Sequence, residues 1–173
     1  INEMTDNMLY VEGSILDRFL TGEINLKRVK ANKVLVATNS PLNNDLVNSV
    51  SAARVTLGLD ASIIVLNTQL RMIATKAKNG SATGEVFGWR ELIDQVSNYD
   101  FDALAISSLI EVEEGVAFDY MRNGGVNPWG GVEAKASRLI ANALNKPVAH
   151  APIDSDIFKD FNEVVEPRLS AET

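Results

Sequence analysis

The chain has 173 residues, of which 46% are hydrophobic and 23% charged, and these values are typical of one globular domain with a sizeable core. Its net charge of −7 argues against a nucleic-acid partner, because phosphate binding needs clustered Lys and Arg. The absence of cysteine excludes disulfides, thiolate catalysis and cysteine metal sites, and it fits a reducing, cytoplasmic location. No apolar run approaches the length of a membrane span, so we expect no membrane partner.

The chain begins at Ile1, not at an initiator methionine, and we expect it to be a piece of a longer protein. The first predicted element is a short helix over residues 14–21. Ser14 and Asp17 resemble a capping box at its start, and Gly22 ends it.

Four short, continuous apolar runs predict strands that are buried on both faces of a sheet, as in parallel α/β proteins. They cover residues 34–37, 63–66, 103–106 and 147–150. Helical periodicity lies between them, over residues 46–57, 89–96 and 132–144. This alternation predicts right-handed crossovers and a three-layer α/β sandwich with a mostly parallel sheet.

One segment breaks the alternation. Residues 70–75 and 83–87 are extended runs on either side of Asn79-Gly80, which predicts an antiparallel β-hairpin beside the sheet, around residues 70–87. The acidic tail over residues 154–173 carries a possible short helix over 157–164. We treat residues 1–173 as one domain.

A glycine-rich loop precedes the third helix. Gly124, Gly125, Gly130 and Gly131 lie within eight residues, together with Asn127. The functional interpretation is a cradle for an anion, because free N–H groups and the positive end of a helix favour negative charge. The structural interpretation is a turn that lets the helix pack closely on a strand. The loop is neither a P-loop nor a dinucleotide fingerprint.

Two titratable residues are candidates for catalysis beside this loop. Glu133 falls in the first turn of the helix, where it is either a favourable partner of the helix dipole or an acid or base that faces a ligand. His150, the only histidine, ends the last predicted strand, and ligands of parallel sheets bind outside the carboxyl ends of strands. The alternative for His150 is a structural hydrogen bond to a neighbouring loop.

Other polar residues also follow predicted strands and would line the same edge of the sheet. They are Thr38, Asn39, Ser40, Ser107 and Ser108. Taken singly, they are ordinary residues for the start of a loop. The absence of a Gly-x-Ser-x-Gly elbow disfavours a hydrolase serine. An acidic run at Glu111, Glu113 and Glu114 could bind a divalent cation, but a solvated loop is the simpler interpretation, and we assign no metal ligands.

Several motifs together resemble an uncharacterised family, a domain of unknown function found in photosynthetic bacteria and plastids. They are Tyr10-Val11-Glu12-Gly13, Gly130-Gly131-Val132-Glu133-Ala134 with Ser137, and Ala149-His150-Ala151-Pro152. The resemblance covers residues 7–152 and implies an α/β domain of unassigned activity, with Glu12, Gly131, Glu133 and His150 as candidate site residues. A reducing compartment like the plastid stroma is the alternative to the cytoplasm. Members of the family usually carry a further glycine-rich segment upstream, and many have a histidine where this chain has Arg138.

These observations favour an enzyme, or a protein that resembles one, that binds a small anionic metabolite at the carboxyl edge of the sheet. The cofactor stays unassigned. We expect Glu12, Glu133 and His150 to approach one another there, with the glycine-rich loop supplying N–H donors. The alternative is a non-catalytic module whose loop forms a subunit interface. We also expect a homo-oligomer, because a chain with few strands leaves open sheet edges and apolar faces.

Overall fold

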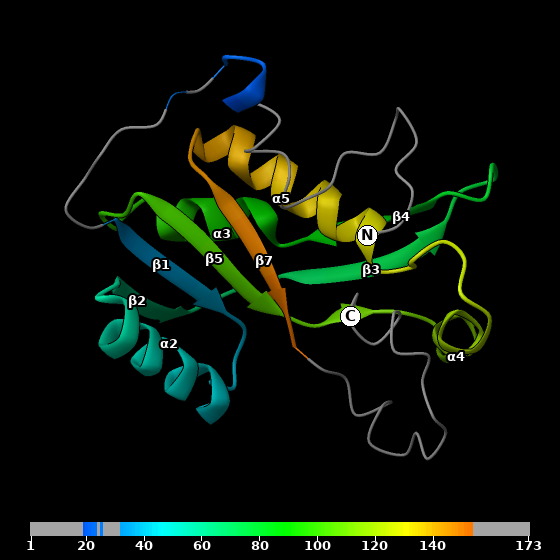
Figure 1. Ribbon diagram of the computed structural model, residues 1–173, viewed down its shortest axis with the longest axis horizontal. Helices are drawn as coiled ribbons and strands as arrows, with labels where there is room; N and C mark the ends of the chain where they lie inside the picture. The colour runs from blue at the N-terminus through cyan, green and yellow to red at the C-terminus, as the bar shows by residue number, and fades with distance from the viewer. Residues whose placement is uncertain (1–18, 24, 26–31, 154–173) are drawn as a thin grey trace.

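The computed structural model describes residues 19–23, 25 and 32–153 (Figure 1). The strands are β1 (Lys33–Thr38), β2 (Asp60–Val65), β3 (Arg71–Lys76), β4 (Ala82–Phe87), β5 (Ala103–Ser108), β6 (Ile110–Glu111) and β7 (Val148–Pro152). The helices are α2 (Asn44–Leu57), α3 (Trp89–Val96), α4 (Glu114–Asn123) and α5 (Gly130–Leu144).

Four strands form a parallel sheet, sheet A, in the order β2-β1-β5-β7. They correspond to the four apolar runs of the sequence, so the prediction of a mostly parallel sheet is confirmed. From β1 the chain moves outward to β2, whereas from β5 it moves to β7 on the other side. The order therefore reverses between β1 and β5, and such switch points are where parallel sheets bind ligands.

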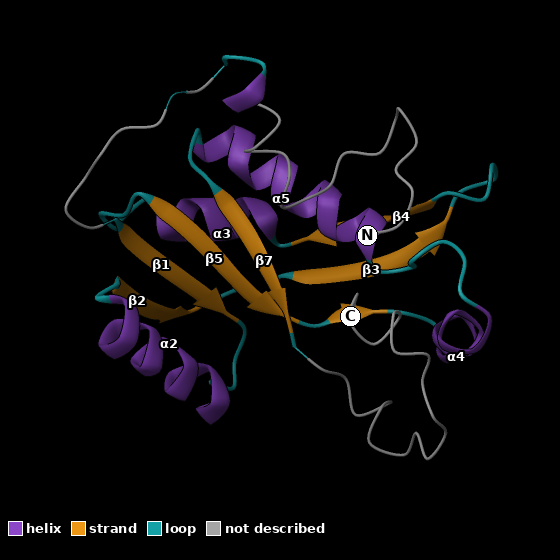
Figure 2. Cartoon of the chain, in the orientation of Figure 1, coloured by secondary structure: helices purple, strands orange, loops and turns teal. Residues whose placement is uncertain are grey.

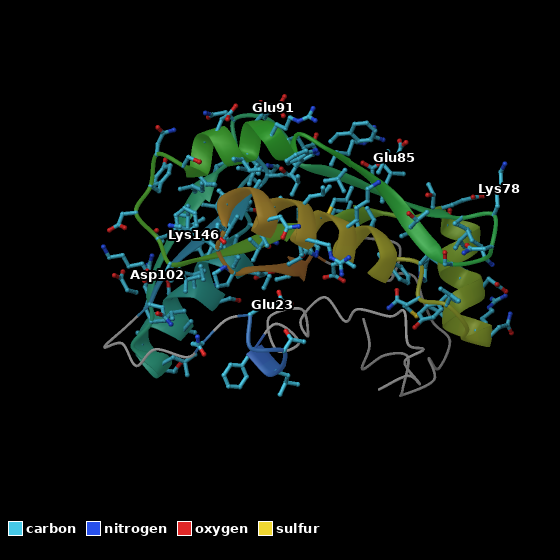
Figure 3. The ribbon with its side chains drawn as sticks, turned by 90° about the horizontal axis from the view of Figure 1, so that it is seen from above. Glu23, Lys78, Glu85, Glu91, Asp102 and Lys146 are labelled. Atoms are coloured by element: carbon cyan, nitrogen blue, oxygen red, sulfur yellow. The ribbon has the colours of Figure 1, made fainter. Side chains whose placement is uncertain are left out.

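The predicted hairpin is confirmed as well. β3 and β4 pair antiparallel, and β6 adds a short parallel strand to complete a second sheet, sheet B, in the order β4-β3-β6. Gly80 has φ +88° in the connecting turn, where the Asn79 side chain accepts a hydrogen bond from the Ser81 amide. Figure 2 shows the hairpin strands extending beyond the parallel strands, and Figure 3 shows Lys78 at the projecting tip.

Helices cover both faces of sheet A (Figure 1). On one face α2 packs through Val50 against Val36 and Ala61. On the other face α3 and α5 enclose the larger core, which includes Leu104 and Ile140. The predicted three-layer arrangement is therefore present, and α5 also crosses onto β3 and β4 of sheet B.

The helices at the three predicted positions begin and end close to the expected residues. α2 stops at Gly58, which adopts φ +62° as the left-handed C-cap. The sequence did not predict α4, because its acidic start was interpreted as a solvated loop. Ala117, Tyr120 and Met121 of α4 are buried at helical spacing, and their burial stabilises the helix despite Gly115 in its first turn.

Two predicted elements cannot be compared in full. Phe19 and Leu20 are helical, and Gly22 adopts φ +79°. The rest of the predicted helix over residues 14–21, and all of that over 157–164, lie outside the described residues.

The Asn39 side chain joins the two sheets. It follows β1 directly, and Leu70 directly precedes β3. Asn39 Oδ1 accepts a hydrogen bond from the Leu70 N–H at 2.9 Å, and Asn39 Nδ2 donates to the Leu70 carbonyl at 2.8 Å. The amide thus pairs with Leu70 as a peptide group of a neighbouring strand would.

Candidate functional site

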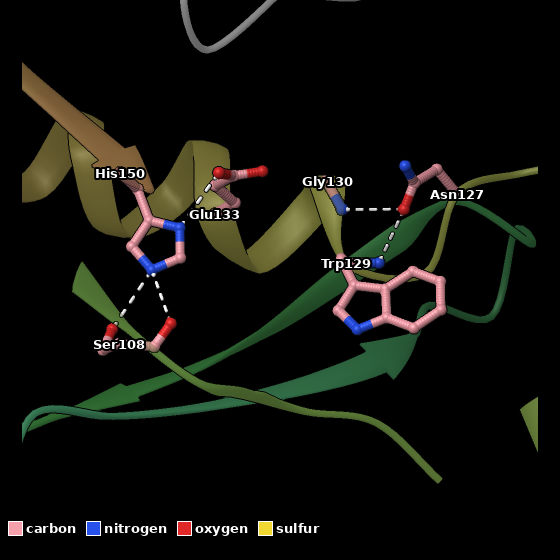
Figure 4. A network of polar contacts seen from close by, with 6 residues as sticks. All are labelled: Ser108, Asn127, Trp129, Gly130, Glu133 and His150. Carbon is pink, nitrogen blue, oxygen red and sulfur yellow. Dashed lines mark hydrogen bonds and ion pairs between the residues drawn. The ribbon is translucent and has the colours of Figure 1, made fainter. Parts of the chain in front are cut away.

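Three polar side chains from three separate elements meet at the carboxyl edge of sheet A (Figure 4). Ser108 is the last residue of β5, His150 lies in β7, and Glu133 lies in the first turn of α5. The strands β5 and β7 are neighbours, with Ile106 opposite His150. This pairing sets the His150 ring beside the end of β5.

The helix α5 delivers Glu133 to this edge because a helix between parallel strands starts where the preceding strands end. Val132, Ala136 and Ile140 form a buried stripe along α5, and this stripe fixes the rotation of the helix about its axis. With that stripe fixed, Glu133 faces β7.

Both ring nitrogens of His150 have partners. Nδ1 lies 2.9 Å from Glu133 Oε1, and Nε2 lies 3.1 Å from both the Ser108 hydroxyl and the Ser108 carbonyl oxygen. The His150 side chain is 1% exposed, whereas that of Glu133 is 23% exposed. Glu133 therefore connects a buried imidazole to the surface of the protein.

The partners of His150 allow the ring to exist in two protonation states. An ionised Glu133 only accepts, so Nδ1 carries a hydrogen. An unprotonated Nε2 accepts a hydrogen bond from the Ser108 hydroxyl, and a protonated Nε2 donates one to the Ser108 carbonyl. Each state finds a hydrogen-bond partner without movement of the backbone, which is what an acid–base group requires.

Of the three residues that we expected to approach one another, Glu133 and His150 form a direct hydrogen bond, and Glu12 lies outside the described residues. That these residues form a functional site stays a prediction. Ser108 joins this pair, although its local sequence does not distinguish it from other polar residues at strand ends. The signal available was its position at the end of the strand beside the one that carries His150.

The glycine-rich loop connects α4 to α5 and is held by its own residues. Gly124 and Gly125 adopt φ of +70° and +111° after α4. Asn127 Oδ1 accepts hydrogen bonds from the amides of Trp129 and Gly130, at 2.9 and 3.3 Å, so it caps the start of α5. The Trp129 ring packs edge-on against Tyr120 of α4, with centroids 5.9 Å apart.

Gly131 lies where the start of α5 meets β4. A Cβ atom at Gly131 would come within 2.3 Å of the Ala82 backbone, whereas one at Gly130 would meet nothing nearer than Asn127 Cγ at 4.0 Å. Gly131 therefore fulfils the structural interpretation of close packing. Gly124, Gly125, Asn127 and Gly130 remain candidates for ligand contact.

The Ser137 hydroxyl adds an unused polar group on the same face of α5 as Glu133, one turn further along. Ser137 is 4% exposed, and its Oγ makes no hydrogen bond within the described part of the chain. A buried hydroxyl without a partner costs free energy and is unusual in native proteins, so a site that satisfies it would be stabilising.

The remaining polar residues at the sheet edge have separate roles. Asn39 bonds Leu70, and the buried Thr38 hydroxyl lies 3.5 Å from the Asn39 carbonyl. Glu111 accepts two hydrogen bonds from the Arg71 guanidinium, at 2.5 and 2.7 Å. Across the described ranges, no three His, Asp or Glu side chains gather as a metal site would require.

The fold and this polar cluster define an α/β domain with a histidine-centred site at the edge of its parallel sheet. The chain belongs to the family described as protein of unknown function (DUF3326), whose model matches residues 1–173. This agrees with the uncharacterised family indicated by the sequence motifs.

One curated relative is an uncharacterised lipoprotein from a Synechococcus strain, 30% identical over 176 residues. The match covers 96% of this chain and 48% of the relative, so the chain spans about half the length of that protein. No solved structure matches the chain. Within the described ranges, none of the helices is long and apolar enough to cross a membrane.

Proposed function

We propose that this domain belongs to an enzyme that carries out acid–base chemistry at His150 on a small anionic metabolite. The observation that carries the proposal is the pair of partners on the imidazole, Glu133 at Nδ1 and Ser108 at Nε2. A carboxylate at one nitrogen orients the ring and stabilises its positive charge, while the other nitrogen exchanges a proton.

The anionic character of the substrate is proposed from the start of α5. Asn127 caps the amides of Trp129 and Gly130, and the amides of Gly131 and Val132 follow in the same turn. The positive end of the helix favours negative charge by about 0.3–1 kcal/mol per interaction. The buried Ser137 hydroxyl, one turn beyond Glu133, has no hydrogen-bond partner among the described residues and offers one to a polar group of the ligand.

The alternative function is a module without catalysis, in which the glycine-rich loop forms a subunit interface. The exposed side chain of Val126, 55% accessible in the middle of that loop, favours this alternative. The two proposals differ in what the loop contacts: a small anion in the first, an apolar surface of another subunit in the second.

Nuclear magnetic resonance tests the proposal directly, because the chain has one histidine and its ring signals need no assignment. Phosphate, sulfate and small carboxylates are titrated while the amides of residues 130–133 and the His150 ring nitrogens are followed. We expect both sets of signals to move with one dissociation constant. Movement of neither set at saturating concentrations would rule out the proposed anion site.

Glu133→Gln separates binding from orientation of the ring. We expect this variant to keep the amide response but to change the Nδ1 signal, because a neutral amide replaces the carboxylate. Glu85→Gln, on the exposed face of β4 (Figure 3), is the matched control and should behave as the wild type.

A further inference from the structure

Resting on the proposed function, we infer that Ser108 is a nucleophile, and that the reaction class is acyl transfer, with small esters or thioesters of anionic acids as substrates. In this reaction class the Ser108 hydroxyl itself attacks the substrate. Under the proposed function alone, His150 only moves protons on a bound metabolite.

The three side chains have the order and spacing of a nucleophile, a base and an orienting acid. Ser108 Oγ lies 3.1 Å from His150 Nε2, and His150 Nδ1 lies 2.9 Å from Glu133 Oε1. Such sites are recognised by geometry and roles, not by a particular sequence motif. Along the chain the order is Ser, Glu, His, an order that α/β hydrolases also use. The missing Gly-x-Ser-x-Gly elbow therefore does not exclude a nucleophile at the end of β5.

The reaction balances with these groups alone. Ser108 Oγ attacks the acyl carbon, an O–C bond forms, and the hydroxyl proton passes to Nε2. The imidazolium gives that proton to the leaving alcohol or thiol as its bond to the acyl carbon breaks. A water molecule then attacks the acyl-serine with Nε2 as base, which releases the acid and restores the Ser108 hydroxyl.

During this reaction, the contact between His150 Nε2 and the Ser108 carbonyl stabilises the charged ring. The Ser108 carbonyl lies 3.1 Å from Nε2, so it accepts a hydrogen bond from the imidazolium once the proton has left the hydroxyl. Glu133 accepts from Nδ1 throughout. Both N–H groups of the imidazolium that forms during attack therefore have an acceptor.

Ser108 is 1% exposed, so its hydroxyl lies beneath the surface of the protein. Ser107 provides an internal comparison. Successive side chains of a strand alternate between faces, so Ser107 Oγ lies on the opposite face of β5 from His150.

A fluorophosphonate probe tests the inference on the full chain. Attack by Ser108 forms an O–P bond and expels fluoride together with the hydroxyl proton, and tandem mass spectrometry locates the adduct. We expect one adduct per chain, at Ser108. Ser108→Ala should abolish it, and Ser107→Ala should label as the wild type does.

The roles of the partners follow from labelling rates. His150→Gln and Glu133→Gln should each slow labelling by roughly a hundredfold or more. If His150→Gln does not fold, Glu133→Gln decides the role of the orienting acid, since Glu133 is partly exposed. Labelling at another serine, or at an equal rate in Glu133→Gln, would overturn the inference.

The two proposals can fail separately. If the probe leaves Ser108 unmodified while phosphate or carboxylates still move the His150 ring signals, Ser108 is not a nucleophile and the acid–base proposal stands. If Ser108 is modified but no anion moves those signals, acyl transfer stands and the anion site falls.

Discussion

At the scale of single residues, some of the described glycines adopt a positive φ in turns, and others lie where two elements touch. Gly84 and Gly131 belong to the second group. A Cβ at Gly84 would lie 2.3 Å from the Ile73 carbonyl oxygen and 2.5 Å from Val132 Cβ. The helix α5 therefore rests directly on the backbone of the hairpin at two positions.

Gly131→Ala should destabilise the protein by about 1–3 kcal/mol, because the new methyl group forces α5 away from β4. Gly130→Ala is the matched control, since its methyl group meets no close atom and alanine favours the helix. Denaturation with urea measures both. Equal stability of the two variants would show that the contact between α5 and β4 tolerates expansion.

At the scale of elements, α5 depends on its cap. Asn127→Ala removes the side-chain acceptor of the Trp129 and Gly130 amides and should cost about 1 kcal/mol of unfolding free energy. Asn127→Asp should retain most of that stability, because a carboxylate accepts the same bonds. Asn123→Ala, at the exposed end of α4, is the comparison, and an equal loss there would contradict a capping role.

The junction of β3 and β6 should make stability depend on pH. Hydrogen bonds from the Arg71 guanidinium, followed by its charge, hold the pKa of Glu111 below its ordinary value of 4.5. A lowered pKa in the folded state stabilises the protein above the unfolded value, and that stabilisation is lost as pH falls through the folded value.

We therefore expect the stability advantage of the wild type over Glu111→Gln to be present at pH 6 and to shrink as the pH falls below the ordinary carboxyl value of 4.5. The advantage should be small, because the pair is exposed to solvent. Urea denaturation across this range measures the advantage, with Glu85→Gln correcting for general effects of acid. An advantage that does not change with pH would contradict the assignment to this pair.

The elements that could be predicted from the sequence are those with a clear local pattern of apolar residues. The parallel strands are continuous apolar runs, and α5 has a regular buried stripe from Val132 to Ile140. The helix α4 was not predicted, because its acidic start and Gly115 are typical of a loop and its apolar residues at helical spacing are few. At the site, the position of Glu133 followed from the rule for helix starts. The expectation that His150 ends its strand was wrong, because β7 continues to Pro152 through its pairing with β5. The contact of Ser108 with His150 could not be predicted, because it depends on which strand lies beside β7.

At the scale of the whole molecule, apolar side chains remain on the outer surface of α2. Val55 is 86% exposed and Leu57 is 76% exposed, and among the described residues β2 and β7 are the outer strands of sheet A. Exposed apolar residues and outer strands are common at association surfaces. The expectation of a homo-oligomer stays a prediction.

Sedimentation velocity should therefore give a dimer or larger species at micromolar concentration. The double variant Val55→Lys, Leu57→Lys should shift it toward monomer if α2 forms the contact. Val126→Lys should do so if the glycine-rich loop forms it, as the non-catalytic alternative requires. A wild-type monomer would remove the expectation altogether.

The bond between Asn39 and Leu70 has a consequence for how the protein ages. This amide links sheet A to sheet B through a donor that faces a carbonyl and an acceptor that faces an N–H. Hydrolysis of the amide to a carboxylate would put an oxygen opposite the Leu70 carbonyl, so repulsion would replace one of the two bonds. The loss of a single ammonia molecule from Asn39 would therefore weaken the contact between sheet A and sheet B, and with it the support of α5.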